Sequence, residues 1–241
     1  MNRAVWILRA GEAIPEVRQT RGDFPGWIRE TSGDAWKGPW RTHDLRRDAD
    51  LPALRDAAAF IITGSAASVT ERAAWMLRTE EYVRGVVASG IPLLGICFGH
   101  QLMAQALGGL VARNPRGREL GTVMLEKLPD ADEDALFSGL PRSFAVNTSH
   151  VDTVVRPPDS ARVLARTDRE RVAAFGLGGD GQLAWGVQFH PEFDGEVVRG
   201  YVRARSPTMA KEGLDPERAL ESAADAPHGR EILRKFLRTV F

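Results

Sequence analysis

Apolar runs alternate with amphipathic stretches through the first 110 residues of the chain. The runs at 4–8, 58–63 and 91–96 predict buried strands, with a further short strand near 40–45. Helical spacing of apolar side chains predicts helices at 15–30, 71–89 and 98–107, the first interrupted by Gly22 and Pro25. Strands that alternate with helices in this way indicate a parallel sheet with crossover helices.

From residue 110 the pattern changes to short apolar runs separated by turn residues. They lie at 121–128, 143–146, 151–155, 161–165, 172–177 and 183–189, with a hairpin turn predicted at residues 176–179. Helical patterns return at 194–204, 208–224 and 228–240. We therefore predict one α/β domain over residues 1–241: an open, mostly parallel central sheet, flanked by helices, with additional antiparallel strands.

Composition removes several classes of protein. The 241 residues are 43% hydrophobic and 27% charged, as in ordinary globular chains. Lysine plus arginine equals aspartate plus glutamate at 32 each, so no bulk charge favours nucleic acid or an anionic membrane. Cys97 is the single cysteine, which excludes an internal disulfide and a multi-cysteine metal site. With no signal-peptide pattern at the N-terminus, a cytoplasmic protein is expected.

Cys97 stands in a pattern that favours a nucleophile. An apolar strand ends at this residue, a helix begins at once, and Gly95 and Gly99 flank it in the spacing of a nucleophile elbow. A tight strand-to-helix turn strains the residue at its apex, and a Cβ at either flank would crowd it. The thiol would then lie at a helix N-terminus, where the dipole favours a thiolate.

A thiolate nucleophile needs a base and a group that orients the base. His190 follows a predicted strand, and Glu192 lies two residues further on, so a turn can return its carboxylate to the imidazole. His100 lies in the elbow but should point elsewhere along its helix. His43 and His228 belong to no visible constellation and are expected at the surface.

Several segments together resemble a known family. They are GICFGHQ at 95–101, FHPE at 189–192, ITGSAASV at 62–69, GRELGT at 117–122 and SHVDTV at 149–154. The residues of these segments and their order along the chain resemble the motifs of the triad-type class I glutamine amidotransferases. The nearest resemblance is to free-standing members like the glutamine amidotransferase domain of GMP synthase. It implies a flavodoxin-like sheet and no metal or other cofactor.

The resemblance also implies roles for individual residues. Cys97 would be the nucleophile, His190 the general base and acid, and Glu192 its orienting carboxylate. The oxyanion hole would use the backbone of Gly64, Ser65 and Phe98, although Ala66 stands where the family often has proline. The matched substrate-binding residues are Gln101, Ser149, His150, Val151 and Asp152. Glu119 and Gly121 match a further motif of the family, and the sequence does not indicate what role this motif has.

The implied reaction is hydrolysis of a γ-glutamyl amide through a thioester on Cys97, releasing glutamate with ammonia or an amine. The substrate would be glutamine or another small γ-glutamyl compound, and no nucleic acid or membrane partner is expected. Two alternatives stay open: a glutaminase subunit that passes ammonia to a separate synthase, and a non-catalytic binding or regulatory subunit. The segments 31–57 and 206–228 are expected to be insertions that differ between such proteins, and candidate lids.

Overall fold

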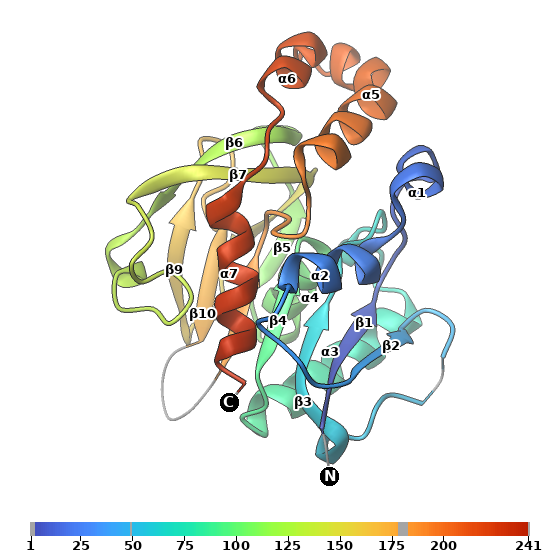
Figure 1. Cartoon of the computed structure of the whole chain (residues 1–241), viewed down its shortest axis with the longest axis vertical. Helices are drawn as coiled ribbons and strands as arrows, with labels where there is room; N and C mark the ends of the chain where they lie inside the picture. The colour runs from blue at the N-terminus through green and yellow to red at the C-terminus, as the bar shows by residue number, and fades with distance from the viewer. Residues whose placement is uncertain (1–2, 49, 178–182, 241) are drawn as a thin grey trace.

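The computed structural model describes residues 3–48, 50–177 and 183–240. Its centre is a sheet in which nine described strands lie in the order β2-β1-β3-β4-β11-β10-β9-β6-β7 (Figure 1). The parallel half contains β1 (Ala4–Arg9), β2 (Trp40–Asp44), β3 (Ala57–Ile62), β4 (Leu93–Ile96) and β11 (Ala184–Val187). This half has the order expected of a flavodoxin-like sheet.

The other half of the sheet is antiparallel. It contains β10 (Ala174–Leu177), β9 (Ala161–Arg166), β6 (Glu119–Lys127) and β7 (Ser143–His150). A separate two-stranded sheet pairs β5 (Leu110–Arg113) with β8 (Asp152–Arg156). The predicted class, an open α/β sheet with added antiparallel strands, is confirmed.

Helices cover both faces of the sheet (Figure 1). On one face, α2 (Phe24–Ser32) and α7 (Pro227–Arg238) pack their apolar sides against the strands through Ile28, Ile232 and Phe236. On the other, α3 (Ala74–Ala88) and α4 (Phe98–Ala106) bury Met76, Val83 and Leu102. Because both faces are covered, the inner parallel strands β3, β4 and β11 are apolar throughout, as the run at 91–96 predicted. The edge strand β2 is instead polar from Arg41 to Asp44.

A third apolar cluster lies beyond the carboxyl ends of the parallel strands. It joins α1 (Pro15–Arg21) and α2 to α5 (Gly195–Lys211), which α6 (Pro216–Ser222) follows. The predicted break between 204 and 208 is wrong, because α5 continues through Pro207. Val202 and Met209 keep the buried face of α5 in this cluster on both sides of the proline. Packing therefore outweighs the loss of one helical hydrogen bond.

Three smaller features differ from what the sequence predicted. The strand β5 was not predicted, since it has only four residues and an exposed Leu110. His43 is buried at 8% exposure, not on the surface. Of the predicted turn at 176–179, the first two residues belong to β10 and the last two lie outside the described residues. Along the described chain, no helix combines the length and apolarity needed to cross a membrane.

Candidate active site

Cys97 lies on the predicted elbow between β4 and α4. Its backbone has φ 51° and ψ −100°, and residues other than glycine rarely adopt a positive φ. A Cβ on Gly95 would come within 2.5 Å of the Gly99 carbonyl oxygen, and one on Gly99 within 2.5 Å of the Ile62 carbonyl oxygen. Both glycines are therefore required by close backbone approach, as the sequence predicted. Strain of this kind costs about 1–3 kcal/mol and persists where the surroundings hold it.

His190 follows the strand that pairs with the strand before Cys97. In the parallel pair β4–β11, Val187 is opposite Ile96, so both chains leave the sheet at the same edge. The Nδ1 atom of His190 lies 2.8 Å from Oε1 of Glu192, and both side chains are buried. The imidazole is stacked on Phe193, with ring centroids 3.9 Å apart. Glu192 and the aromatic contact together fix the orientation of the ring.

The charge state of His190 follows from its neighbours. Burial alone would lower the pKa of the imidazole. Attraction to the Glu192 carboxylate and to the Cys97 sulfur, with hydrogen bonds to both, outweighs burial and raises the pKa of His190 to about 10. The geometry therefore favours an imidazolium beside the cysteine sulfur at neutral pH, which is the arrangement that activates a thiol.

Two backbone amides near Cys97, those of Ser65 and Phe98, are the predicted oxyanion-hole donors. Phe98 begins α4, and Ser65 lies in the loop after β3 and lines the cavity next to Cys97. Across the described ranges, neither amide donates a hydrogen bond to a protein group. A Cβ on Gly64 would lie 2.9 Å from Cε1 of His190, so this position must stay small for the imidazole to fit.

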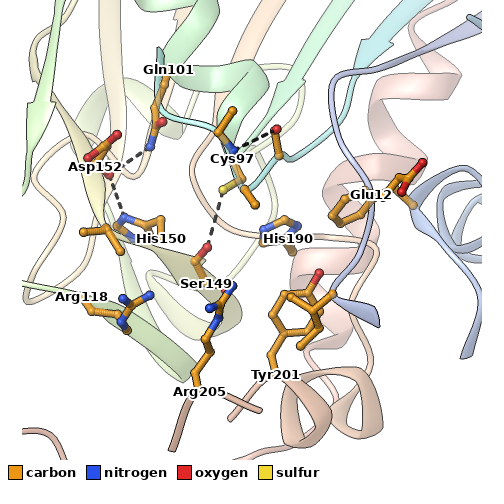
Figure 2. Close-up of a pocket in the computed structure, with 16 residues that line it drawn as sticks. Glu12, Cys97, Gln101, Arg118, Ser149, His150, Asp152, His190, Tyr201 and Arg205 are labelled. Carbon is orange, nitrogen blue, oxygen red and sulfur yellow. Dashed lines mark hydrogen bonds between the residues drawn. The ribbon is translucent and has the colours of Figure 1, made fainter. Parts of the chain in front are cut away.

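The 149–152 loop, where β7 ends and β8 begins, forms the wall opposite His190, and Figure 2 shows Ser149, His150 and Asp152 on the Cys97 side of the cavity. The Ser149 carbonyl accepts a contact from the Cys97 Sγ at 3.8 Å. Gln101 donates from Nε2 to the Asp152 carbonyl and to Gln188 Oε1, both at 2.9 Å. Val151 is tied to the neighbouring loop through its carbonyl, which accepts from the Asn114 amide at 2.9 Å. The residues matched at 149–152 thus meet Gln101 at one cavity.

A buried group of charges holds this loop in place. The ring of His150 lies 3.2 Å from Oε2 of Glu119 through Nε2, and 3.9 Å from Oε2 of Glu170 through Nδ1. Thr167 donates to Glu119 at 2.6 Å and Thr153 donates to Glu170 at 2.8 Å. Burial alone would lower the pKa of His150. The nearby carboxylates, chiefly that of Glu119, outweigh burial, so the pKa of His150 is raised. The unassigned GRELGT motif therefore supplies a carboxylate that fixes His150.

His100 behaves differently from His150 and His190. Its ring is fully buried against Phe175, with centroids 4.9 Å apart. Burial lowers its pKa to about 3, so the imidazole is neutral. It does not line the cavity, in agreement with the prediction that it is not the base.

The cavity at these residues has a volume of about 140 Å³. Lining residues to which the sequence assigned no role in the site include Glu12, Ile14, Phe24, Arg118, Tyr201 and Arg205. Tyr201 and Arg205 are four residues apart on α5, a spacing that could have drawn attention to them. No described residue of 31–57 or 206–228 lines the cavity, so the expectation that these segments are lids is not supported.

Fold and site together define an α/β protein with cysteine, histidine and glutamate at the carboxyl edge of a parallel sheet. The chain belongs to the family described as glutamine amidotransferase class-I, whose model matches residues 39–201. It is 45% identical over 145 residues to the GMP synthase (glutamine-hydrolyzing) of Aeropyrum pernix, covering 60% of this chain but 26% of that protein.

Two further similar proteins are matched over nearly their whole length. A glutamine amidotransferase-like protein of Schizosaccharomyces pombe is 27% identical over 98% of this chain and 99% of its own length. The structure of a glutamine amidotransferase from Thermotoga maritima superposes with a TM-score of 0.73, over 100% of this chain and 96% of that one. At 22% sequence identity, the latter likeness concerns the fold.

Proposed function

We propose that this chain hydrolyses the γ-amide bond of a glutamyl substrate, with Cys97 as nucleophile. The observation that carries the proposal is the convergence of three features on one cavity. Cys97 lies on a strained elbow, the buried His190–Glu192 pair faces it, and the amides of Ser65 and Phe98 are free to bind an oxyanion. Membership of the class-I family supports this reaction class.

The chemistry proceeds in two steps. The Cys97 thiolate attacks the γ-carbonyl carbon, and the Ser65 and Phe98 amides donate hydrogen bonds to the oxygen that becomes negative. Each such donor contributes about 3 kcal/mol to the transition state. The His190 imidazolium gives its proton to the leaving nitrogen, so ammonia or an amine departs and a γ-glutamyl thioester remains.

In the second step, neutral His190 takes a proton from water, which attacks the thioester and releases glutamate. Glu192 keeps the imidazole in one tautomer throughout and stabilises its charged form. Gln101 and the backbone and side chains of Ser149, His150, Val151 and Asp152 would hold the glutamyl part of the substrate, since they form the opposite wall of the cavity.

A second function has a specific observation in its favour. The chain is 40% identical over 134 residues to a protein from Saccharolobus solfataricus that is named as one of the subunits of a glutamine-hydrolyzing GMP synthase. That match covers 55% of this chain and 65% of the relative. By this likeness the same site could release ammonia for a separate synthase. Both functions use hydrolysis at Cys97. They differ in whether the isolated chain hydrolyses its substrate without a synthase.

The test is glutamate release by the purified chain, with glutamine and a panel of γ-glutamyl amides as substrates. We expect Cys97→Ala to abolish release while its circular dichroism and melting temperature stay close to those of the wild type. Mass spectrometry after reaction with a diazoketone analogue of glutamine should find the label on Cys97. Retained turnover by Cys97→Ala would refute the proposal. A labelled Cys97 without turnover would favour the ammonia-supplying role.

A further inference from the structure

Arg205 differs from every other charged side chain of the cavity. Glu12 is paired with Arg18, Arg118 with Glu212, His150 with Glu119, His190 with Glu192, and Asp152 accepts from Ser68. In residues 3–48, 50–177 and 183–240, no acceptor or carboxylate partners Arg205. Its side chain is half-buried and points into the cavity in Figure 2.

The place of Arg205 along α5 connects it to the histidine side of the cavity. Tyr201 precedes it by one helical turn and packs on Phe193, with ring centroids 5.0 Å apart. Phe193 in turn stacks on His190. Residues four apart lie on one face of a helix, so the wall formed by α5 extends outward from His190 past Tyr201 to Arg205.

The leaving group of the proposed reaction must lie on this side, because His190 protonates its nitrogen. The wall beside His190 includes Ile14, Phe24 and Tyr201, and the Phe24 ring lies 6.0 Å from the imidazole. Departing ammonia would need neither an apolar wall nor a cation. An amino acid has an aliphatic part for such a wall and a carboxylate for a guanidinium.

We propose that Arg205 binds the carboxylate of an amino acid leaving group, so that the preferred substrates are γ-glutamyl amino acids. The inference rests on the proposed function and names its substrate class. The bond broken is the amide between the γ-carbonyl and the α-nitrogen of the second amino acid. That nitrogen takes the proton of His190, and the free amino acid departs with its carboxylate still facing Arg205.

Arg118 is the natural alternative cation, and its contacts separate it from this role. Its guanidinium donates to both carboxylate oxygens of Glu212, at 2.8 and 3.2 Å. This pairing already neutralises its charge. Arg205 therefore has the charge available for a substrate anion.

The experiment compares γ-glutamylalanine with γ-glutamyl ethylamide, which has the same amide bond and lacks the second carboxylate. Wild type, Arg205→Gln and Arg203→Gln are assayed for kcat/KM on both. Arg203 is an exposed arginine on the same helix that does not line the cavity, and it is the matched control. We expect Arg205→Gln to lose at least about tenfold more kcat/KM on γ-glutamylalanine than on the ethylamide, mostly through KM. Arg203→Gln should show no such difference.

Binding in the inactive Cys97→Ala background separates this inference from the proposed function. Calorimetry should show γ-glutamylalanine binding about tenfold more tightly than the ethylamide, and the added Arg205→Gln change should remove the difference. Wild-type inactivity with this binding pattern intact would count against self-sufficient hydrolysis but support the carboxylate site. An equal loss on both substrates would place Arg205 against the glutamyl half instead, and no loss on either would remove it from recognition. Both results overturn the inference.

Discussion

The elbow at Cys97 and the loop at 149–152 face each other across one cavity, but different forces hold them in place. At the elbow, Gly95 and Gly99 let three backbone segments approach so closely that no Cβ would fit. At the loop, the His150 ring is held between the Glu119 carboxylate at 3.2 Å and the Asp152 carbonyl at 3.0 Å, with Glu170 at 3.9 Å, and His150 and both glutamates are buried. One wall is fixed by steric exclusion and the other by paired charge.

This difference bears on how each wall responds to change. A steric constraint has no dependence on pH or salt, whereas a buried ion pair depends on the protonation of its members. The elbow should therefore fail abruptly with any added atom. The loop should respond in degrees to a loss of charge.

The largest effect is expected at His190, which lies beside Cys97 and opposite the 149–152 loop. His190→Ala removes the proton donor and the cation beside the thiol, so kcat should fall at least roughly a thousandfold. Glu192→Ala leaves the imidazole in place and removes its orientation, so we expect a smaller loss than for His190→Ala. Steady-state rates of glutamate release provide the measurement. The reverse order would refute the assignment of Glu192 as the orienting group.

Gly95→Ala should break the elbow itself. The new Cβ would lie 2.5 Å from the Gly99 carbonyl oxygen and 2.6 Å from the Met103 sulfur, so α4 must move. We expect the free energy of unfolding to fall by about 1–3 kcal/mol, with a parallel loss of turnover. Gly85→Ala is the control, because this exposed helical glycine has nothing within 4 Å of an added Cβ. It should stabilise the protein by up to about 1 kcal/mol, and equal denaturation midpoints for the two variants would contradict the steric account.

Glu119→Gln should weaken the loop and leave the elbow intact. The amide keeps the shape of the side chain but removes the charge that raises the pKa of His150. We expect kcat/KM to fall roughly tenfold, mainly through KM, and the pKa of His150 to fall in an NMR titration of the imidazoles. Glu126→Gln, on the same strand but paired with Arg166 near the surface, should change neither. An unchanged pKa of His150 in Glu119→Gln would contradict the view that charge holds this wall in place.

The stability of the protein should also vary with pH through His190. The pKa of His190 is raised from 6.5 to about 10, so between these values the folded chain retains a proton that the unfolded chain has lost. The free energy of unfolding supplied by this group is complete below pH 6.5 and falls as pH rises toward 10. Urea unfolding at about pH 7 and about pH 9 should show a smaller decrease for His190→Gln than for wild type. His228→Gln, a half-buried histidine outside the cavity, should keep the wild-type slope.

The same contrast explains what the sequence could predict. Gly95, Cys97 and Gly99 lie within five residues, and His190 and Glu192 within three, so their geometry is a local property of the chain. The alternation of strands and helices likewise predicted the parallel half of the sheet. That residues 1–241 form a single domain stays a prediction.

The unpredicted features are those that need distant residues to meet. The role of Glu119 depends on Thr167 and Glu170, which β9 and β10 bring alongside it, and no spacing in the sequence announces that contact. Arg205 lies on an amphipathic helix, and the pattern alone does not say which neighbour its polar face meets. Polar, glycine-containing segments such as 206–228 indicate exposure to solvent, which is not the same as a position over the cavity.

The pairing of β4 with β11 has a consequence for variation in this chain. The Cys97 amide donates to the Val187 carbonyl at 2.8 Å, so the nucleophile's own backbone is the last rung of the ladder that leads to His190. The long excursion between these strands returns to the same rung whatever its length, and the entropy of closing a loop grows only with the logarithm of that length. Insertions and deletions between β4 and β11 can therefore accumulate without moving the Cys97 thiol away from the His190 imidazole.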